Sequence, residues 1–131
     1  MPARAGVQEH EGFAYLSEDA FLRYFANGVP REKAEVLYAA QEPPAASLFG
    51  ERTSQAAWRS KPSWYAVSKR DQTISPELER FLARRMNATT VELDAGHLSL
   101  VSHAREISEL ILAAAGRPPA PLPMQHGGAA P

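Results

Sequence analysis

The sequence predicts an α/β fold in which a helical segment is followed by a strand–helix–strand–helix unit with parallel strands. A short run of aromatic and β-branched residues, 63–67, follows a proline and is typical of a buried strand. Apolar residues then recur at the spacing of one helix face: Leu78, Phe81, Leu82 and Met86. A second strand-like run covers residues 89–93. Because a helix joins the two strands, they are expected to run parallel with a right-handed crossover.

Composition limits the kind of protein to one ordinary globular domain. The 131 residues are 44% hydrophobic and 22% charged, with a net charge of −1, so neither nucleic acid nor an anionic membrane is an expected partner. There are no cysteines, which excludes disulfides and cysteine nucleophiles. No apolar run approaches the roughly 20 residues that cross a bilayer. The polar start has no signal-peptide core, so we expect a cytoplasmic protein.

Residue composition and hydrophobic periodicity divide the chain into four stretches. Residues 1–11 are small and polar without any period, and we expect them to be disordered. Residues 12–57 form a helical, cap-like segment, and residues 58–116 form the strand–helix–strand–helix unit. Residues 117–131 are rich in proline, glycine and alanine and are expected to be a disordered tail.

Capping residues place the helices of the cap-like segment. Ser17 is an N-cap with two acidic residues behind it, and Gly28 is placed to end that helix. A second helix is expected over about 31–41, where two prolines follow, and a short helical turn over 45–49.

The helices of the second unit carry their own signals, with Ser75 as the N-cap of the first and Ser102 as the N-cap of the last. Gly116 closes the last helix. Two parallel strands alone make a poor sheet, because parallel sheets are normally wider and covered on both faces. We therefore expect further sheet to belong with this unit.

Two residues that suit acid–base chemistry follow the two predicted strands. Asp71 lies in the loop after the first strand, and His97 lies in the loop after the second. In α/β sheets the carboxyl ends of parallel strands gather at one edge, where active sites form. A carboxylate there can orient an imidazole, which then takes a proton from a nucleophile. Asp94, three residues before His97, is a rival partner, although a turn role is the simpler interpretation.

Four stretches of the sequence resemble the end of a known enzyme family. They cover residues 61–65, residues 71–78 (DQTISPEL), residues 81–86 (FLARRM) and residues 96–103 (GHLSLVSH). The chain over about residues 12–115 resembles small bacterial α/β-hydrolases of the salicylate-esterase and methyl-esterase type, which are also similar to plant hydroxynitrile lyases. The resemblance implies a partial α/β-hydrolase fold, a cap over the acyl pocket, Asp71 as the triad acid and His97 as its base.

The nucleophile of that family is not found in these 131 residues. The family places its serine in a G-x-S-x-G elbow upstream of the acid, and none of the ten serines here stands in such a motif. The expected function is therefore the acid–base part of a serine-dependent ester hydrolase, without metal or organic cofactor. Its expected partners are a small-molecule ester and an N-terminal hydrolase half that would complement the chain, or a second copy of itself. By itself the chain is expected to lack esterase activity.

Two alternatives stay open at this point. The first is that the chain is a truncated, non-catalytic module that folds with a partner. The second is that it supports hydroxynitrile-lyase-like chemistry with the same Asp71 and His97.

Overall fold

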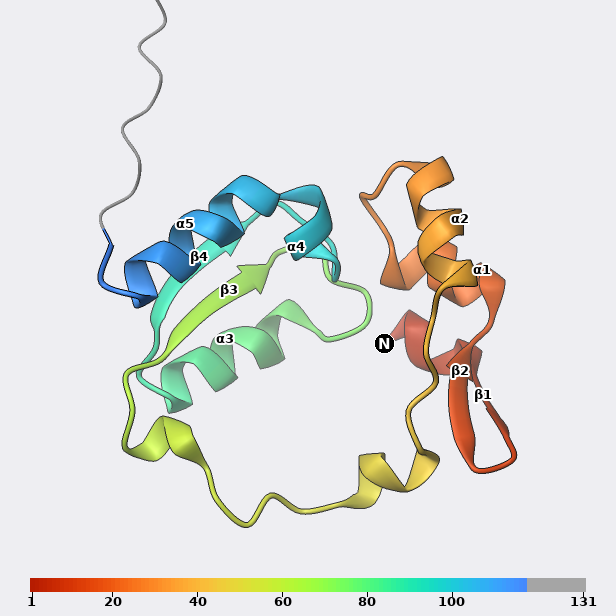
Figure 1. Cartoon of the computed structure of the whole chain (residues 1–131), viewed down its shortest axis with the longest axis horizontal. Helices are drawn as coiled ribbons and strands as arrows, with labels where there is room; N and C mark the ends of the chain where they lie inside the picture. Colours follow the sequence, from red (N-terminus) through yellow and green to blue (C-terminus); the bar gives the residue numbers. More distant parts are fainter. Residues whose placement is uncertain (118–131) are drawn as a thin grey trace, which may run out of the picture.

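Two small sheets organise the chain, each made of two strands, with helices beside them (Figure 1). The computed structural model describes residues 1–117. The N-terminal part contains strands β1 (Val7–His10) and β2 (Phe13–Leu16) and helices α1 (Glu18–Ala20) and α2 (Arg31–Ala39). The C-terminal part contains β3 (Trp64–Ser68), α3 (Pro76–Arg85), β4 (Thr89–Leu93), α4 (Ser99–Ser102) and α5 (Ala104–Ala114). An extended segment with short 3-10 turns at Ala46–Gly50 and Ala57–Arg59 connects the two parts.

The C-terminal part has the predicted α/β architecture. Strands β3 and β4 pair in parallel, in a register that runs from Trp64 opposite Thr89 to Ser68 opposite Leu93. Helix α3 joins them, and α5 packs on the same small sheet. The predicted parallel pairing is therefore confirmed, and the loops that follow the two strands lie at the same end of the sheet (Figure 1).

The expectation that residues 1–11 are disordered is wrong. Residues Pro2–Gly6 form a 3-10 turn, and β1 pairs antiparallel with β2 in a hairpin. The two residues at the hairpin tip, Glu11 and Gly12, have φ angles of 49° and 80°. A two-residue turn with two positive φ angles matches the twist of the flanking strands, which explains why a short and exposed strand such as β1 can form.

The helices of the cap-like segment lie close to their predicted positions, but the segment, predicted to be helical, also contains strand β2. The Ser17 hydroxyl accepts a hydrogen bond from the backbone N–H of Ala20, at 3.4 Å, and so caps α1. The helix then continues as a π-helical turn, Phe21–Phe25, and ends near Gly28, which has a φ of 85°. Helix α2 ends at Ala39, two residues earlier than expected.

The helix ends of the C-terminal part are predicted correctly except at one place. Ser75 accepts from the N–H of Leu78 at 3.2 Å, and Gly116, with a φ of 71°, follows α5. Ser102 does not cap α5: it is the last residue of the extra helix α4, and its hydroxyl lies 2.9 Å from Nδ1 of His103. The short helix α4 shifts the start of α5 by one residue, so that His103 and not Ser102 is its N-cap. Of the expected disordered tail, residues 118–131 lie outside the described residues.

The core is small and is built mainly from alanines. The largest fully buried side chain among the described residues is Val67, in β3. A second cluster in the cap-like segment gathers around Phe21, with Leu98 from the other part packed against it. Helix α3 turns Glu79 and Ala83 inward. Two members of its apolar face are about half exposed, Leu78 at 47% and Phe81 at 50%.

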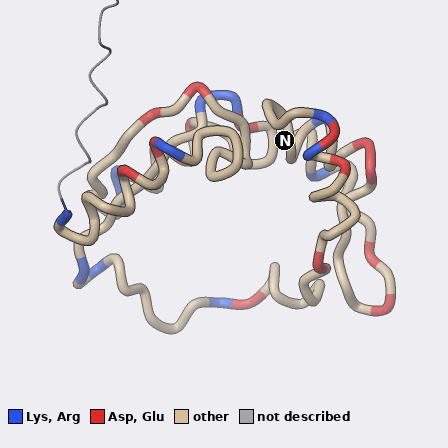
Figure 2. Tube along the Cα trace, turned by 45° about the horizontal axis from the view of Figure 1, so that its top comes forward, with Lys and Arg blue, Asp and Glu red and all other residues tan. Residues whose placement is uncertain are grey.

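Charged residues of both signs are spread along the trace (Figure 2). The β1–β2 hairpin carries acidic residues at Glu9 and Glu11. Among the helices within residues 1–117, none is long and apolar enough to cross a membrane.

Candidate active site

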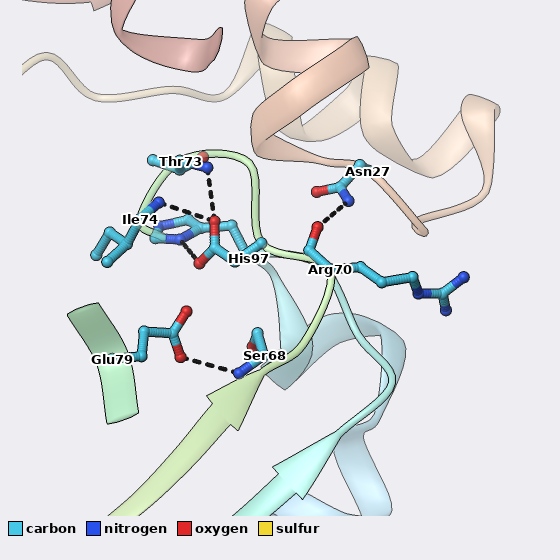
Figure 3. Close-up of polar contacts among 8 residues, drawn as sticks. Asn27, Ser68, Arg70, Thr73, Ile74, Glu79 and His97 are labelled. Carbon is cyan, nitrogen blue, oxygen red and sulfur yellow. Dashed lines mark hydrogen bonds and ion pairs between the residues drawn. The ribbon is translucent and has the colours of Figure 1, made fainter. Parts of the chain in front are cut away.

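The two predicted site residues meet at the carboxyl end of the β3–β4 sheet. Nδ1 of His97 lies 2.7 Å from Oδ2 of Asp71, although the two residues are 26 positions apart in the chain (Figure 3). This distance corresponds to a short hydrogen bond between an imidazole and a carboxylate. The predicted geometry, with adjacent loops at one end of two parallel strands, is confirmed.

Backbone amides hold the other oxygen of Asp71. Oδ1 accepts the N–H of Thr73 at 2.6 Å and the N–H of Ile74 at 2.9 Å, so the loop folds back around its own carboxylate (Figure 3). The side chain is only 4% exposed. Burial by itself would raise the pKa of Asp71, but the hydrogen bonds from His97, Ile74 and Thr73 outweigh it and lower the pKa below its usual value. Asp71 is therefore held as an anion.

His97 is fixed on one side and open on the other. Its ring packs against the ring of Phe25 from the cap-like segment, with 4.8 Å between centroids. Nδ1 is taken by Asp71, whereas Nε2 makes no hydrogen bond with any residue of the described part, 1–117. The side chain is 25% exposed and lines a hollow of about 250 Å³ beside β3. Because Asp71 accepts at Nδ1, the imidazole keeps Nε2 free to take a proton.

The rival carboxylate, Asp94, is engaged elsewhere. Its Oδ1 lies 3.1 Å from Nε of Arg70, and its backbone carbonyl accepts from the same guanidinium. Both side chains of this pair are well exposed. Asp94 therefore fastens the two loops together at the surface, and Asp71 is the carboxylate that orients His97.

Two residues at the junction with the cap-like segment were not predicted. Asn27 donates from Nδ2 to the carbonyl of Arg70, at 2.8 Å, and so ties the turn after α1 to the Asp71 loop. A side chain at Gly96 would lie 2.1 Å from the carbonyl oxygen of Asn27, so only glycine permits this approach. A hollow of about 540 Å³ lies along this junction. Nothing in the sequence marks Asn27, because an Asn before a glycine is an ordinary helix end.

A third residue missed by the sequence, Glu79 on α3, is buried beneath the pair. Its Oε2 accepts the N–H of Ser68, at 2.9 Å (Figure 3). It was missed because a charged residue next to the apolar positions Leu78 and Phe81 of a helix is normally expected to face solvent. His103 lies against Ser102 and is not part of the Asp71–His97 pair. Within residues 1–117, no group of three or more His, Asp or Glu side chains is arranged to hold a metal ion.

Comparison with known protein families agrees with this arrangement. The model of the alpha/beta hydrolase family matches residues 1–110, which include both parts of the fold and both site residues. The chain belongs to the α/β-hydrolase family. Searches of curated proteins and of solved structures find no match.

The order of site residues in this α/β-hydrolase is the order of the family triad. In α/β-hydrolases the nucleophile comes first, the acid second and the histidine last. Here Asp71 precedes His97, and each follows a parallel strand. Membership of the family therefore agrees with the acid and base positions that the sequence predicted, without naming a subfamily or a substrate.

Proposed function

We propose that Asp71 and His97 are the acid and base of a serine-dependent ester hydrolase that acts on a small-molecule ester. The observation that carries this proposal is the 2.7 Å contact between Oδ2 of Asp71 and Nδ1 of His97, with Nε2 left without a partner in the described part of the chain. His97 would remove the proton of the serine hydroxyl and return it to the leaving alcohol. Asp71 would hold the ring and stabilise the imidazolium that forms.

The nucleophile would come from a second segment. None of the ten serines lies in a G-x-S-x-G elbow, so we propose that a hydrolase segment carrying that elbow docks beside the open edge of β3. Such a segment would also contribute oxyanion-hole donors, which usually supply the largest catalytic effect. The hollow lined by His97, Tyr65 and Ser68 lies next to this edge.

A mixing experiment tests the proposal. The chain alone and the chain mixed with an N-terminal α/β-hydrolase half bearing the elbow are assayed with p-nitrophenyl acetate. We expect activity only in the mixture, its abolition by His97→Ala, and a fall of about 10⁴-fold in kcat with Asp71→Asn. Asp94→Asn is the matched control and should leave the rate unchanged. Activity in the mixture that survives His97→Ala would overturn the proposal.

A second candidate function, a non-catalytic pairing module, has an observation of its own. Leu78 and Phe81 leave about half of their surface exposed on α3, and within residues 1–117 β3 pairs with a strand on one edge only. Exposed apolar faces and strand edges pair readily with another chain. The mixing experiment separates the two candidates, because a pairing module would bind the second half without gaining activity.

A further inference from the structure

Glu79 is a buried carboxyl group that the proposed mechanism does not use. The residue is 4% exposed, and it points from α3 towards the end of β3. Its Oε2 accepts the backbone N–H of Ser68, while Oε1 is buried without a hydrogen-bond partner. In Figure 3, one oxygen of Glu79 is bonded to Ser68 and the other is turned towards the side chains around His97. A buried polar atom without a partner is costly, so its protonation state needs an explanation.

The surroundings of Glu79 favour its protonated form. Burial, followed by hydrogen bonding and charge from the neighbouring Asp71, raises the pKa of Glu79 to about 7. The N–H of Ser68 and the charge of Arg80 act in the opposite direction. Arg80 is itself bonded to Glu92, at 2.8 and 2.9 Å. Tyr65, on β3, is the other titratable neighbour, and burial together with the charges of Glu79 and Asp71 raises its pKa.

The hydrogen bonds decide which of the two carboxyl groups keeps the proton. Asp71 accepts from two backbone amides and from His97, and each of these bonds stabilises its anion. Glu79 accepts from a single amide. Two adjacent carboxyl groups that are buried together do not both ionise readily. The proton therefore belongs on Glu79.

We propose that Glu79 is a positioning residue for the Asp71–His97 pair, which it holds by donating a hydrogen bond from protonated Oε1 to Oδ2 of Asp71. Oδ2 would then accept from His97 on one side and from Glu79 on the other. Loss of the proton replaces this bond with repulsion between two carboxylates, so the anchoring of Asp71 weakens as Glu79 ionises. The catalytic importance of this contact rests on the proposed function, whereas the contact itself does not.

Carboxyl NMR of the 131-residue chain, with ¹³C-labelled Asp and Glu, tests the contact without any need for activity. We expect the Glu79 carboxyl signal to titrate with a midpoint near 7, and the Asp71 signal to move in the same step. Glu79→Gln keeps both roles, since its amide oxygen accepts from Ser68 and its amide N–H donates to Asp71. In this variant the Asp71 carboxyl signal should no longer move near pH 7, because no carboxyl group at position 79 titrates there. Glu77→Gln, an exposed carboxyl change on the same helix, should leave that step in place.

The ring of His97 supplies the second measurement. Its carbon-bound proton shifts depend on its packing against Phe25. At low pH they should be the same in wild type and in Glu79→Gln, and they should move in Glu79→Ala, which removes the donor. A Glu79 signal that titrates near its ordinary value of 4.5, or an Asp71 signal that ignores the Glu79 step, would overturn the positioning role. Either result would leave the esterase proposal standing, and a failed mixing assay would leave the contact standing.

Discussion

The Asp71–His97 pair at the carboxyl end of the β3–β4 sheet and the apolar face of α3 differ in how much of each is engaged by other residues of the chain. At the sheet end, one carboxylate accepts three hydrogen bonds, and a ring from the cap-like segment covers the histidine. On the face of α3, Leu78 and Phe81 remain about half exposed. The Asp71 carboxylate therefore finds its hydrogen-bond donors within this chain, whereas two apolar side chains of α3 stay half exposed. A site can be preorganised by its own loops even where the sheet behind it is narrow.

The largest expected effect comes from removing Asp71, the hydrogen-bond acceptor at the carboxyl end of the sheet. Asp71→Ala leaves two backbone N–H groups and Nδ1 of His97 without their acceptor, and we expect a loss of about 3 kcal/mol in the free energy of unfolding. Urea titration measures it. Asp94→Ala removes an exposed carboxylate in the neighbouring loop and should cost less than about 1 kcal/mol. Equal losses in the two variants would show that the buried hydrogen bonds do not stabilise this end.

A side chain at Gly96 tests the junction that completes the site. In Gly96→Ala the new Cβ would overlap the carbonyl of Asn27, and we expect a loss of about 2 kcal/mol in the free energy of unfolding. Gly50→Ala is the matched control, since it meets no atom within 4 Å and does not have a positive φ. Circular dichroism melts compare the two. A Gly96 variant as stable as the Gly50 variant would mean that the cap-like segment is not seated against the Asp71–His97 loops.

The pH dependence of stability tests the buried carboxyl group beneath the site. The pKa of Glu79 is raised in the folded chain from 4.5 to about 7, so its contribution is complete below pH 4.5 and is lost as the pH rises to about 7. Glu79→Gln stays neutral and should be more stable than wild type by about 2 kcal/mol at pH 8, with no difference at pH 4.5. Asp71 acts in the opposite direction. Its pKa is lowered, so the stability that it contributes is lost as the pH falls, at pH values below the range in which Glu79 titrates. A pH-independent difference between wild type and variant would contradict the assignment.

The smallest expected effect concerns the half-exposed apolar face of α3. We propose that Phe81 takes part in self-association or in docking of a second segment. Phe81→Glu should weaken self-association about tenfold, because a charge would replace a half-exposed apolar ring. Val36→Glu is the control, since Val36 is 66% exposed on a helix remote from β3. Sedimentation velocity distinguishes them, and equal effects of the two variants would remove the special role of this face.

The sequence predicted the C-terminal unit well because local signals agreed there. Ser75 and Gly116 mark helix ends, and two short apolar runs joined by a helix allow one parallel arrangement. That arrangement alone was enough to bring Asp71 next to His97. The preference for Asp71 over Asp94 came from the family resemblance, and the hydrogen bonds of the two loops agree with it.

Other features depend on contacts that no local pattern records. The β1 strand is exposed along its length and has no alternation of apolar and polar residues, so it forms through its turn and its partner. Ser102 has the chemistry of an N-cap, yet the preceding residues already form α4 and its hydroxyl is used there. Asn27 and Glu79 matter through neighbours 43 and 11 positions away, respectively. Such pairings follow from tertiary packing and not from residue type.

The Asn27–Arg70 hydrogen bond also bears on how the cap-like segment is held to the rest of the chain. It closes a loop of 43 residues, whereas the Asp71–His97 contact closes one of 26. By chain-entropy scaling the longer closure costs only about 0.4 kcal/mol more. The longer loop therefore adds little to the entropic cost of holding the cap-like segment against the rest of the chain. We expect this segment to open as a separate cooperative unit, so that amide hydrogen exchange in α1 and α2 is faster than in β3 and β4.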